Sequence, residues 1–258
     1  MLKSVLRSAS QHFSGALARR LQARLYASDL NKLATVYGTD KWNSHFYTPH
    51  YQRHFGHLRA KKLNILEIGV GGHSDACAGG ASLRMWKAFF PNSMIHAIDI
   101  HDKSSFQENR IRIYRGSQFD RDFLIETYNK IGSLDIVIDD GSHVNEHVIF
   151  AFNTLFPLLN ENGIYVVEDT QTSYWKQFGG DSENLRNPVT SMNFFKDLAD
   201  CLNYAEIPRA GYEPTQFDKT IVAIHFYHNL AFIQKGHNDE GSNKPHMVDP
   251  YGRGNSQP

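Results

Sequence analysis

The 258-residue chain is long enough for one α/β domain of ordinary size with extensions at both ends. Hydrophobic residues make up 41% of it and charged residues 21%, which is typical of a globular protein and excludes a disordered one. Basic and acidic residues each number 27, a balance that argues against a nucleic-acid partner. Two cysteines, Cys77 and Cys201, and no apolar run of membrane-spanning length predict a cytoplasmic protein without a disulfide framework or a membrane span.

The first 28 residues contain five basic residues and no acidic one, with apolar residues at roughly helical intervals. This pattern is typical of an organellar presequence, of a helix that lies on a membrane surface, or of an amphipathic helix that packs on its own domain or on a neighbouring subunit. We favour the amphipathic helix that packs on its own domain or on a neighbouring subunit, and we expect the protein to be a homo-oligomer. The main domain is predicted at 29–236, and residues 237–258, rich in Gly, Asn, Ser and Pro, are predicted to form an irregular tail.

Short apolar runs alternate with amphipathic stretches along the main domain, which is typical of βαβ units and a mainly parallel sheet. The stretch 170–188 has few periodic apolar residues and is predicted to be a surface loop long enough to act as a lid. The fold class is therefore α/β, with a doubly wound sheet of seven strands that ends in an antiparallel hairpin. Strands are predicted at 63–68, 94–100, 111–114, 134–139 and 164–167, helices at 82–90, 121–131, 146–159 and 193–203, and the hairpin at 219–226 and 230–234.

The first strand runs into a glycine-rich turn, Glu67-Ile-Gly69-Val-Gly71-Gly72, and the second ends at Asp99. Glycines there let the backbone approach a ligand, and a carboxylate at the second strand end can hold both hydroxyls of a ribose. The dinucleotide-binding fingerprint fits less well, because the third glycine is missing and 32 residues separate Glu67 from Asp99 instead of about 20. A bound nucleoside other than a dinucleotide is the better prediction.

Four carboxylates follow the fourth and fifth strands: Asp139, Asp140, Glu168 and Asp169. One crossover helix separates the strands, so we expect them to be neighbours whose acidic ends meet. Carboxylates so close repel one another unless a cation lies among them, and Mg²⁺ prefers oxygen ligands. The sequence therefore predicts a magnesium site, with Asp140, Glu168 and Asp169 as its ligands.

His143 follows Asp140 by three residues, beyond a glycine that permits a tight turn. A hydroxyl bound to a cation is more acidic than a free alcohol, so a neutral imidazole with an ordinary pKa suffices to take its proton. We predict that His143 is the general base.

Several motifs of the chain resemble the metal-dependent sugar O-methyltransferases of macrolide and tetracenomycin-type antibiotic tailoring, which are class I S-adenosylmethionine-dependent enzymes with a Rossmann-like sheet. The resemblance covers about residues 29–236, and its most specific part is the pair DDGSH and VEDT. The matching segments are ILEIGVGG at 65–72, GGASLRMW at 79–86, DDGSH at 139–143, VEDT at 167–170, and the stretches 37–42, 45–51, 224–227 and 235–236.

The resemblance implies roles for single residues. Asp140, Glu168 and Asp169 would bind Mg²⁺ and His143 would be the catalytic base, in agreement with the interpretation from the strand ends. S-adenosylmethionine would contact residues of the glycine turn and of the strand ends, the stretch GTDKW would close over it, and the residues after the third strand would lie near the adenine. The residues assigned to the cofactor are Thr39, Lys41, Glu67, Gly69, Gly71, Asp99, Ser117, Gln118 and Asp139.

Methyl transfer from S-adenosylmethionine to a sugar hydroxyl of a glycosylated natural product or other glycoconjugate is therefore the leading hypothesis. The acceptor would be a small-molecule glycoside. Two alternatives stay open: metal-dependent methylation of a catechol or phenol, and a nucleoside-binding module without catalysis. Asp140, His143, Glu168 and Asp169 together argue against the last.

Overall fold

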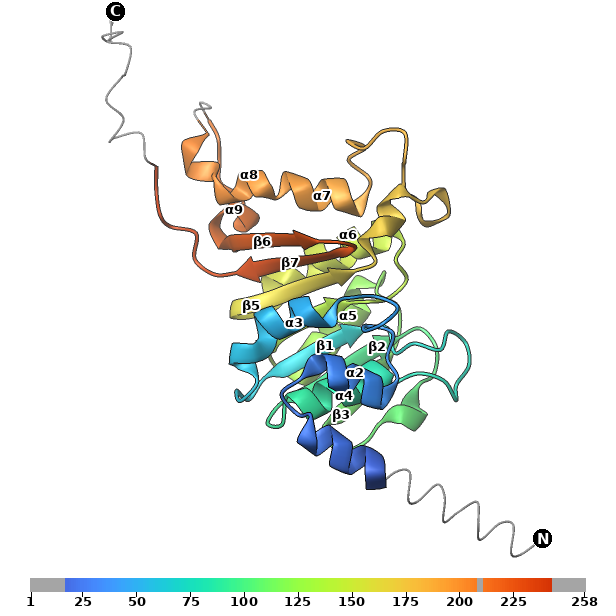
Figure 1. The fold of residues 1–258 in the computed structure, drawn as a ribbon. Coiled ribbons are helices and arrows are strands. Elements are labelled where there is room, and N and C mark those ends of the chain that lie inside the picture. The colour runs from blue at the N-terminus through green and yellow to red at the C-terminus, as the bar shows by residue number, and fades with distance from the viewer. Residues whose placement is uncertain (1–16, 208–210, 243–258) are drawn as a thin grey trace, which may run out of the picture.

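The computed structural model describes residues 17–207 and 211–242, and within them the chain folds around one seven-stranded sheet with helices on both faces (Figure 1). The strands lie in the order β3-β2-β1-β4-β5-β7-β6. The pairs among β1 to β5 are parallel, whereas β7 is antiparallel to both β5 and β6. This arrangement confirms the predicted doubly wound sheet with its terminal hairpin.

The first half of the sheet follows the sequence prediction closely. Three of its strands, β1, β2 and β4, are mostly apolar and buried, as expected for parallel strands that are covered on both faces, whereas in the edge strand β3 one residue, Ile111, is buried. The strands are β1 (Asn64–Ile68), β2 (Met94–Asp99), β3 (Ile111–Arg115) and β4 (Leu134–Asp139), and the helices and the short 3-10 turn between them are α4 (Ala81–Phe89), η2 (Ser104–Phe106) and α5 (Arg121–Ile131).

The crossover from β4 to β5 differs from the prediction. A helix was expected as far as residue 159, but α6 (Asn145–Leu155) gives way to a 3-10 turn, η3 (Phe156–Leu158), and β5 (Leu159–Glu168) begins at once. Pro157 lies in the turn and has no backbone N–H to continue an α-helix. The Asn-Glu-Asn-Gly segment at 160–163 belongs to an irregular start of β5, with Asn162 at φ 63° and a register shift against β4.

The segment before β1 contains one predicted helix and two that the sequence analysis did not predict. Residues 17–25, within the predicted N-terminal helix, are helical. The helices α2 (Leu30–Tyr37) and α3 (Thr48–Phe55) and the 3-10 turn η1 (Gly56–Leu58) follow and were not predicted. The boundary signals of α2 are present in the sequence: Asp29 accepts a hydrogen bond from the Lys32 N–H, and Gly38 ends the helix at φ 72°. Residues 1–16 of the predicted N-terminal helix lie outside the described residues, as do residues 243–258 of the predicted tail.

The predicted lid is partly ordered by hydrogen bonds. Its first part forms two 3-10 turns, and the Asn145 side chain donates to the carbonyls of Thr172 at 3.2 Å and Phe178 at 2.8 Å, so irregular chain is confined to about residues 179–190. The elements from here on are η4 (Thr170–Tyr174), η5 (Lys176–Phe178), α7 (Ser191–Asp197), α8 (Ala199–Leu202), η6 (Tyr204–Glu206), α9 (Gln216–Thr220), β6 (Ile221–Tyr227) and β7 (Leu230–Lys235).

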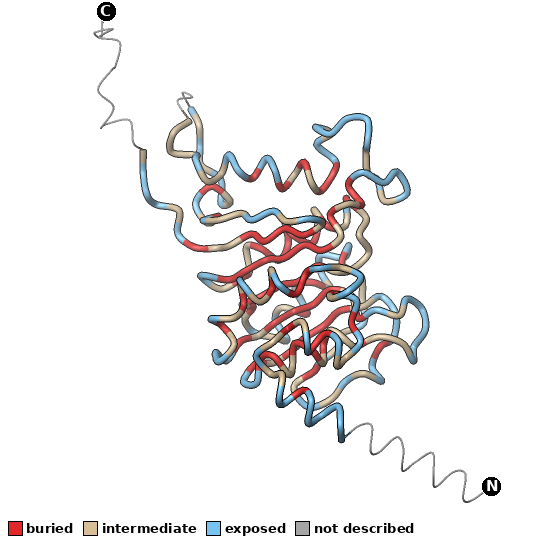
Figure 2. Tube along the Cα trace, viewed as in Figure 1, coloured by how far each residue is buried: buried red, intermediate tan, exposed pale blue. Residues whose placement is uncertain are grey.

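Two apolar cores cover the two faces of the sheet, and both are visible as buried chain in Figure 2. One core lies under α2, α3 and α4, and the other under α5, α6 and α7. Successive residues of a strand serve opposite cores, as Ile65 and Leu66 do in β1. The sheet is thereby fixed from both sides, and the carboxyl ends of β1, β2, β4 and β5 form one rigid edge. No helix within the described ranges has the length and apolar character needed to cross a membrane.

One buried histidine, His96, and one half-buried histidine, His54, make the stability of this fold dependent on pH. Burial lowers the pKa of His96 to about 4, and burial together with His225 and Arg53 does the same for His54. Both values lie below the ordinary 6.5, so as the pH falls the unfolded chain binds protons first. The stability that the neutral imidazoles contribute is present above about pH 6.5 and is lost between about 6.5 and 4.

His96→Leu should therefore reduce the loss of stability on acidification. Urea unfolding of the wild type and of the variant at pH 7 and pH 4.5 measures this difference. The wild type should lose more of its free energy of unfolding between the two pH values than His96→Leu does. The same loss in both proteins would contradict a buried, neutral His96.

Candidate active site

The turn after β1 holds the ends of β1 and β4 together. A Cβ added to Gly69, which has φ 94°, would lie 2.2 Å from the carbonyl oxygen of Asp140, so no other residue fits without a shift of the backbone. A Cβ added to Gly71, which has φ 79°, would lie 3.8 Å from the Gly79 Cα, an ordinary contact distance. Gly69 is thus required by the packing of the two strand ends, whereas Gly71 is favoured by its positive φ alone.

Asp99 fixes the same turn from the end of β2. One carboxylate oxygen accepts the N–H of Val70 at 3.0 Å, and the other accepts the N–H of His101 at 2.8 Å. Each carboxylate oxygen can accept more than one hydrogen bond, so Asp99 retains acceptor capacity for two further hydroxyls.

Lys41 lies at the centre of a buried cluster of carboxylates. Its Nζ donates to Asp140 Oδ2 at 2.7 Å and to Glu168 Oε1 at 2.6 Å, and it lies 3.2 Å from Glu67 Oε1. The Tyr51 hydroxyl also donates to Glu168 Oε1, at 2.5 Å. Lys41 is therefore an internal counter-ion for β1, β4 and β5.

The surroundings of Lys41 keep it charged. Burial alone would lower the pKa of its ammonium, but the carboxylates of Asp140, Glu168 and Glu67 outweigh burial and raise this pKa well above the ordinary value. Burial also raises the pKa of Glu67, whose Oε2 accepts the Ser82 hydroxyl at 2.9 Å. Glu67 thus faces Lys41 and Ser82 inside the protein.

Thr39, also assigned to the cofactor, is buried, and its hydroxyl donates to Asp40 at 3.4 Å.

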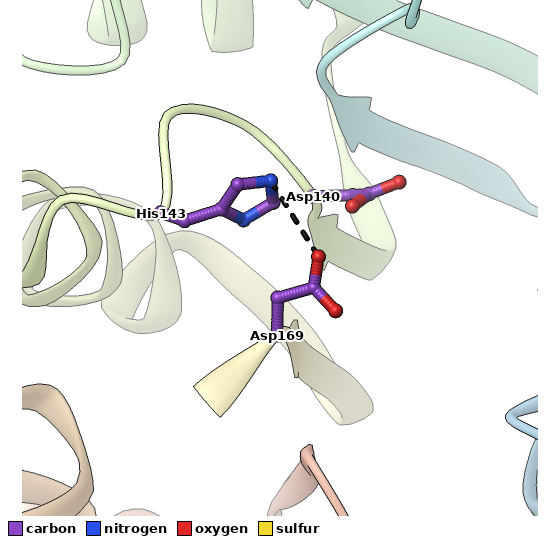
Figure 3. Close-up of side chains that lie close together, drawn as sticks. All are labelled: Asp140, His143 and Asp169. Atoms are coloured by element: carbon purple, nitrogen blue, oxygen red, sulfur yellow. Dashed lines mark ion pairs between the residues drawn. The ribbon is translucent and has the colours of Figure 1, made fainter. Parts of the chain in front are cut away.

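Asp140, His143 and Asp169 form a second, more accessible cluster (Figure 3). Each offers one ligand atom, and these atoms lie within 4.8 Å of one another. His143 Nε2 is 3.7 Å from Asp169 Oδ2, and the hydroxyl of Tyr47 donates to Asp169 Oδ1 at 2.6 Å. Burial would raise the pKa of Asp169, but the Tyr47 hydrogen bond and the nearby histidines, His143 and then His45, lower it. Asp169 therefore stays a carboxylate beside His143.

The backbone of this second cluster is strained. His143 has φ 57° and Asp169 has φ 54°, in the left-handed region that residues other than glycine seldom adopt. Such a conformation costs roughly 1–3 kcal/mol, and it persists where the surrounding structure holds it for a function. Asp169 follows directly on β5, and His143 lies in the loop between β4 and α6; their side chains face one another (Figure 3).

Asp139 lies behind the accessible cluster. It is 1% exposed, and burial raises the pKa of its carboxyl to about 7. Gln118 Nε2 donates to Asp139 Oδ1 at 3.2 Å, and Gln118 Oε1 accepts the N–H of Ser142 at 2.7 Å. Gln118 thereby fixes the loop that carries His143. The Ser117 hydroxyl oxygen accepts the N–H of Phe119 within its own turn.

The donor set fits a divalent cation. Asp140 and Asp169, two of the three predicted ligands, supply carboxylate oxygens in the cluster with His143, whereas the third predicted ligand, Glu168, lies outside this cluster. The hydrogen bonds that Glu168 receives from the described residues reach Oε1 and not Oε2. Glu168 is buried, so it would bind from the inner side.

The sequence analysis had not assigned Tyr47, Tyr51 and His45, although the stretch 45–51 had been noted as part of the resemblance.

The chain is similar in sequence to methyltransferases of known activity. No family model matches the chain, but demethylmacrocin O-methyltransferase of Streptomyces fradiae is 48% identical over 215 residues, which is 83% of this chain and 54% of that protein. A tetracenomycin-C 2'-O-methyltransferase of Streptomyces olivaceus, whose name specifies an 8-demethyl-8-alpha-L-rhamnosyl acceptor, is 47% identical over 79% of this chain and 53% of its own length. The chain spans about half the length of these curated relatives.

A solved structure agrees with them. It is the MycE methyltransferase from the mycinamycin biosynthetic pathway in complex with Mg and SAH, and it matches with a TM-score of 0.81 and 46% identity over 83% of this chain and 56% of that chain. The chain is a homologue of the macrocin-, mycinamicin- and tetracenomycin-type sugar O-methyltransferases. The resemblance inferred from the motifs is confirmed, and so is the class I methyltransferase fold.

Lys41→Met should destabilise this methyltransferase fold, because it leaves buried carboxylates without their cation. Breaking a buried ion pair costs roughly 3–5 kcal/mol, and urea unfolding in EDTA would measure the change. Lys32→Met, which removes an exposed partner of Asp29, is the matched control and should leave the unfolding curve nearly unchanged. Adding Glu168→Gln to Lys41→Met should recover part of the loss. A Lys41→Met protein as stable as the wild type would refute the role of Lys41 as an internal counter-ion.

Proposed function

We propose that the protein transfers a methyl group from S-adenosylmethionine to a hydroxyl of a sugar, with Mg²⁺ bound at the ends of β4 and β5. The observation that supports this most is the cluster of Asp140, His143 and Asp169, which combines cation ligands with a base at the carboxyl edge of a class I methyltransferase sheet. The solved homologue was crystallised with Mg and SAH, the product form of the cofactor.

The ligand set we propose for the cation is Asp140, Glu168 through Oε2, and Asp169. When bound, Mg²⁺ would make a coordinated hydroxyl more acidic. The residues of the chain then do the rest: His143 accepts the hydroxyl proton on its imidazole, and the Asp169 carboxylate, 3.7 Å from Nε2, stabilises the imidazolium that results. Tyr47 holds Asp169 in place through its 2.6 Å hydrogen bond.

The cofactor site we propose lies at the ends of β1 and β2. Asp99 would bind the ribose, the glycine turn at Gly71 would border the rest of the cofactor, and Ser117 with Gln118 would border the adenine. Asp139, with a pKa near 7, supports the same wall through Gln118. Because Glu67 and Lys41 are both buried, they would support the cofactor site from inside the protein. Gly69 and Thr39 would determine the conformation of the backbone beside that site.

A glycoside is the acceptor we propose. Tyr174 and Trp175 are 41% and 44% exposed on the segment that follows Asp169, and an aromatic face there can stack on a sugar ring. Several relatives are named for the sugar or glycoside that they methylate, which supports a role in tailoring a glycosylated natural product.

We also propose that residues 29–236 are the catalytic unit, that the region 170–188 covers the acceptor, and that the protein works in the cytoplasm as a homo-oligomer.

Metal and His143 should have separable effects. EDTA should abolish methylation of a panel of rhamnosides, and Mg²⁺ should restore it. Asp169→Asn should weaken Mg²⁺ binding measured by calorimetry. His143→Ala should bind Mg²⁺ and cofactor almost normally but reduce kcat by roughly 10²–10⁴-fold. Full activity without metal, or a normal kcat for His143→Ala, would refute the mechanism; methylation of catechols in place of rhamnosides would refute the acceptor class.

Asp99→Ala should weaken the binding of S-adenosylhomocysteine, because both ribose hydroxyls lose their acceptor. Calorimetry without acceptor would measure the dissociation constant, and an increase of roughly tenfold or more is expected for two lost hydrogen bonds. Glu126→Ala, which removes an acid that is 65% exposed in the middle of α5, controls for the loss of a carboxylate. Unchanged affinity in Asp99→Ala would exclude this ribose site.

A further inference from the structure

The helix over residues 17–25 turns its large apolar side chains away from the domain. Leu17, Leu21 and Leu25 are 52%, 58% and 75% exposed, while Ala23 is 6% exposed. Leu21 and Leu25 each lie two positions from Ala23, which places them about 200° around the helix axis, on the opposite face. A helix that packs only on its own domain shows the reverse arrangement. In the described part of the helix, the buried residue that packs against the domain, as predicted, is Ala23.

A basic groove lies beside this leucine stripe. It has a volume of about 810 Å³, Leu17 and Leu21 border it, and seven basic side chains line it. Three of them, Arg19, Arg20 and Arg24, come from the helix, and the other four come from the domain beneath. Among the described lining residues one is acidic, Glu108, and it already pairs with Lys87 at 3.1 Å and lies 3.8 Å from Arg84. The groove therefore carries a large local excess of positive charge in a chain of zero net charge.

The groove lies at the opposite ends of the strands from the candidate active site. Arg59 precedes β1, Pro91 precedes β2 and Arg110 precedes β3, so the groove is at the amino ends of the parallel strands. The methyl-transfer residues are at the carboxyl ends. The groove is a separate surface, and a partner bound there leaves the catalytic edge accessible.

We propose that the leucine stripe and the basic groove together dock on an anionic phospholipid membrane. Phospholipids combine the two chemistries on the surface, since phosphate headgroups match the arginines and acyl chains match the leucines. A free phosphate ligand would occupy the groove but leave the leucines in water. The first 28 residues of the sequence contain no Asp or Glu that would repel the headgroups. The helix over residues 17–25 lies in the interface, with its arginines at the phosphates.

Flotation of the purified full chain with vesicles tests the proposal. Vesicles of phosphatidylcholine with phosphatidylglycerol should bind at least about tenfold more protein than vesicles of phosphatidylcholine alone, and high salt should weaken the binding. Arg20→Glu with Arg24→Glu should lower the partition coefficient at least 25-fold, because each basic residue near an anionic surface contributes about fivefold. Arg121→Glu with Lys130→Glu, on exposed positions of α5, is the charge-matched control and should bind normally.

The leucines are tested separately. Leu21→Ser with Leu25→Ser should lower partitioning at least about tenfold, while Leu185→Ser, at a leucine that is 56% exposed elsewhere, should not. Absent binding to anionic vesicles, or equal binding to neutral ones, would overturn the proposal. So would a leucine variant whose mass by light scattering falls to that of a monomer while its vesicle binding is unchanged, because the stripe would then be a contact between copies of the chain.

Discussion

The pairing of one buried ammonium group with three carboxylates is the constraint on which the rest of the site depends. Glu67, Asp140 and Glu168 come from the ends of three adjacent strands, β1, β4 and β5, and without a cation their charges would repel one another. Lys41 lies among them with 1% of its side chain exposed, which ties the segment before α3 to the sheet. The Tyr47 hydroxyl, also from this segment, donates to Asp169, and the Tyr51 hydroxyl, from α3, donates to Glu168.

This arrangement divides the acids into an inner and an outer set. The inner oxygens face Lys41, Tyr51 and Ser82, so a cation that arrived from solvent would meet the outer oxygens of Asp140 and Asp169 and, in the ligand set we propose, the second oxygen of Glu168. The ammonium group also offsets part of the negative charge, which suits a divalent ion. Because Lys41 contacts both Glu67, assigned to the cofactor, and Asp140, a proposed metal ligand, it links the two halves of the proposed site.

Local patterns predicted most of the sheet and the position of the acids. Continuous apolar runs defined β1 and β4, and two acidic doublets after neighbouring strands predicted the cluster. The helices α2 and α3 were missed because each has only eight residues, too few for a clear apolar period. The partners of the acids could not be predicted, since Lys41 and Tyr51 meet Glu168 across 127 and 117 residues and only the fold brings them together. The left-handed backbone of His143 and Asp169 likewise depends on tertiary packing.

The most direct test of this account is an anomalous difference map from crystals of the protein grown with Mn²⁺ and S-adenosylhomocysteine. We predict one strong peak within coordination distance of Asp140 and Asp169, with Lys41 still bonded to Glu168 Oε1 and the His143 ring facing the acceptor side of the ion. A peak elsewhere, or an ion that displaces Lys41 from the carboxylates, would contradict the division into an inner and an outer set.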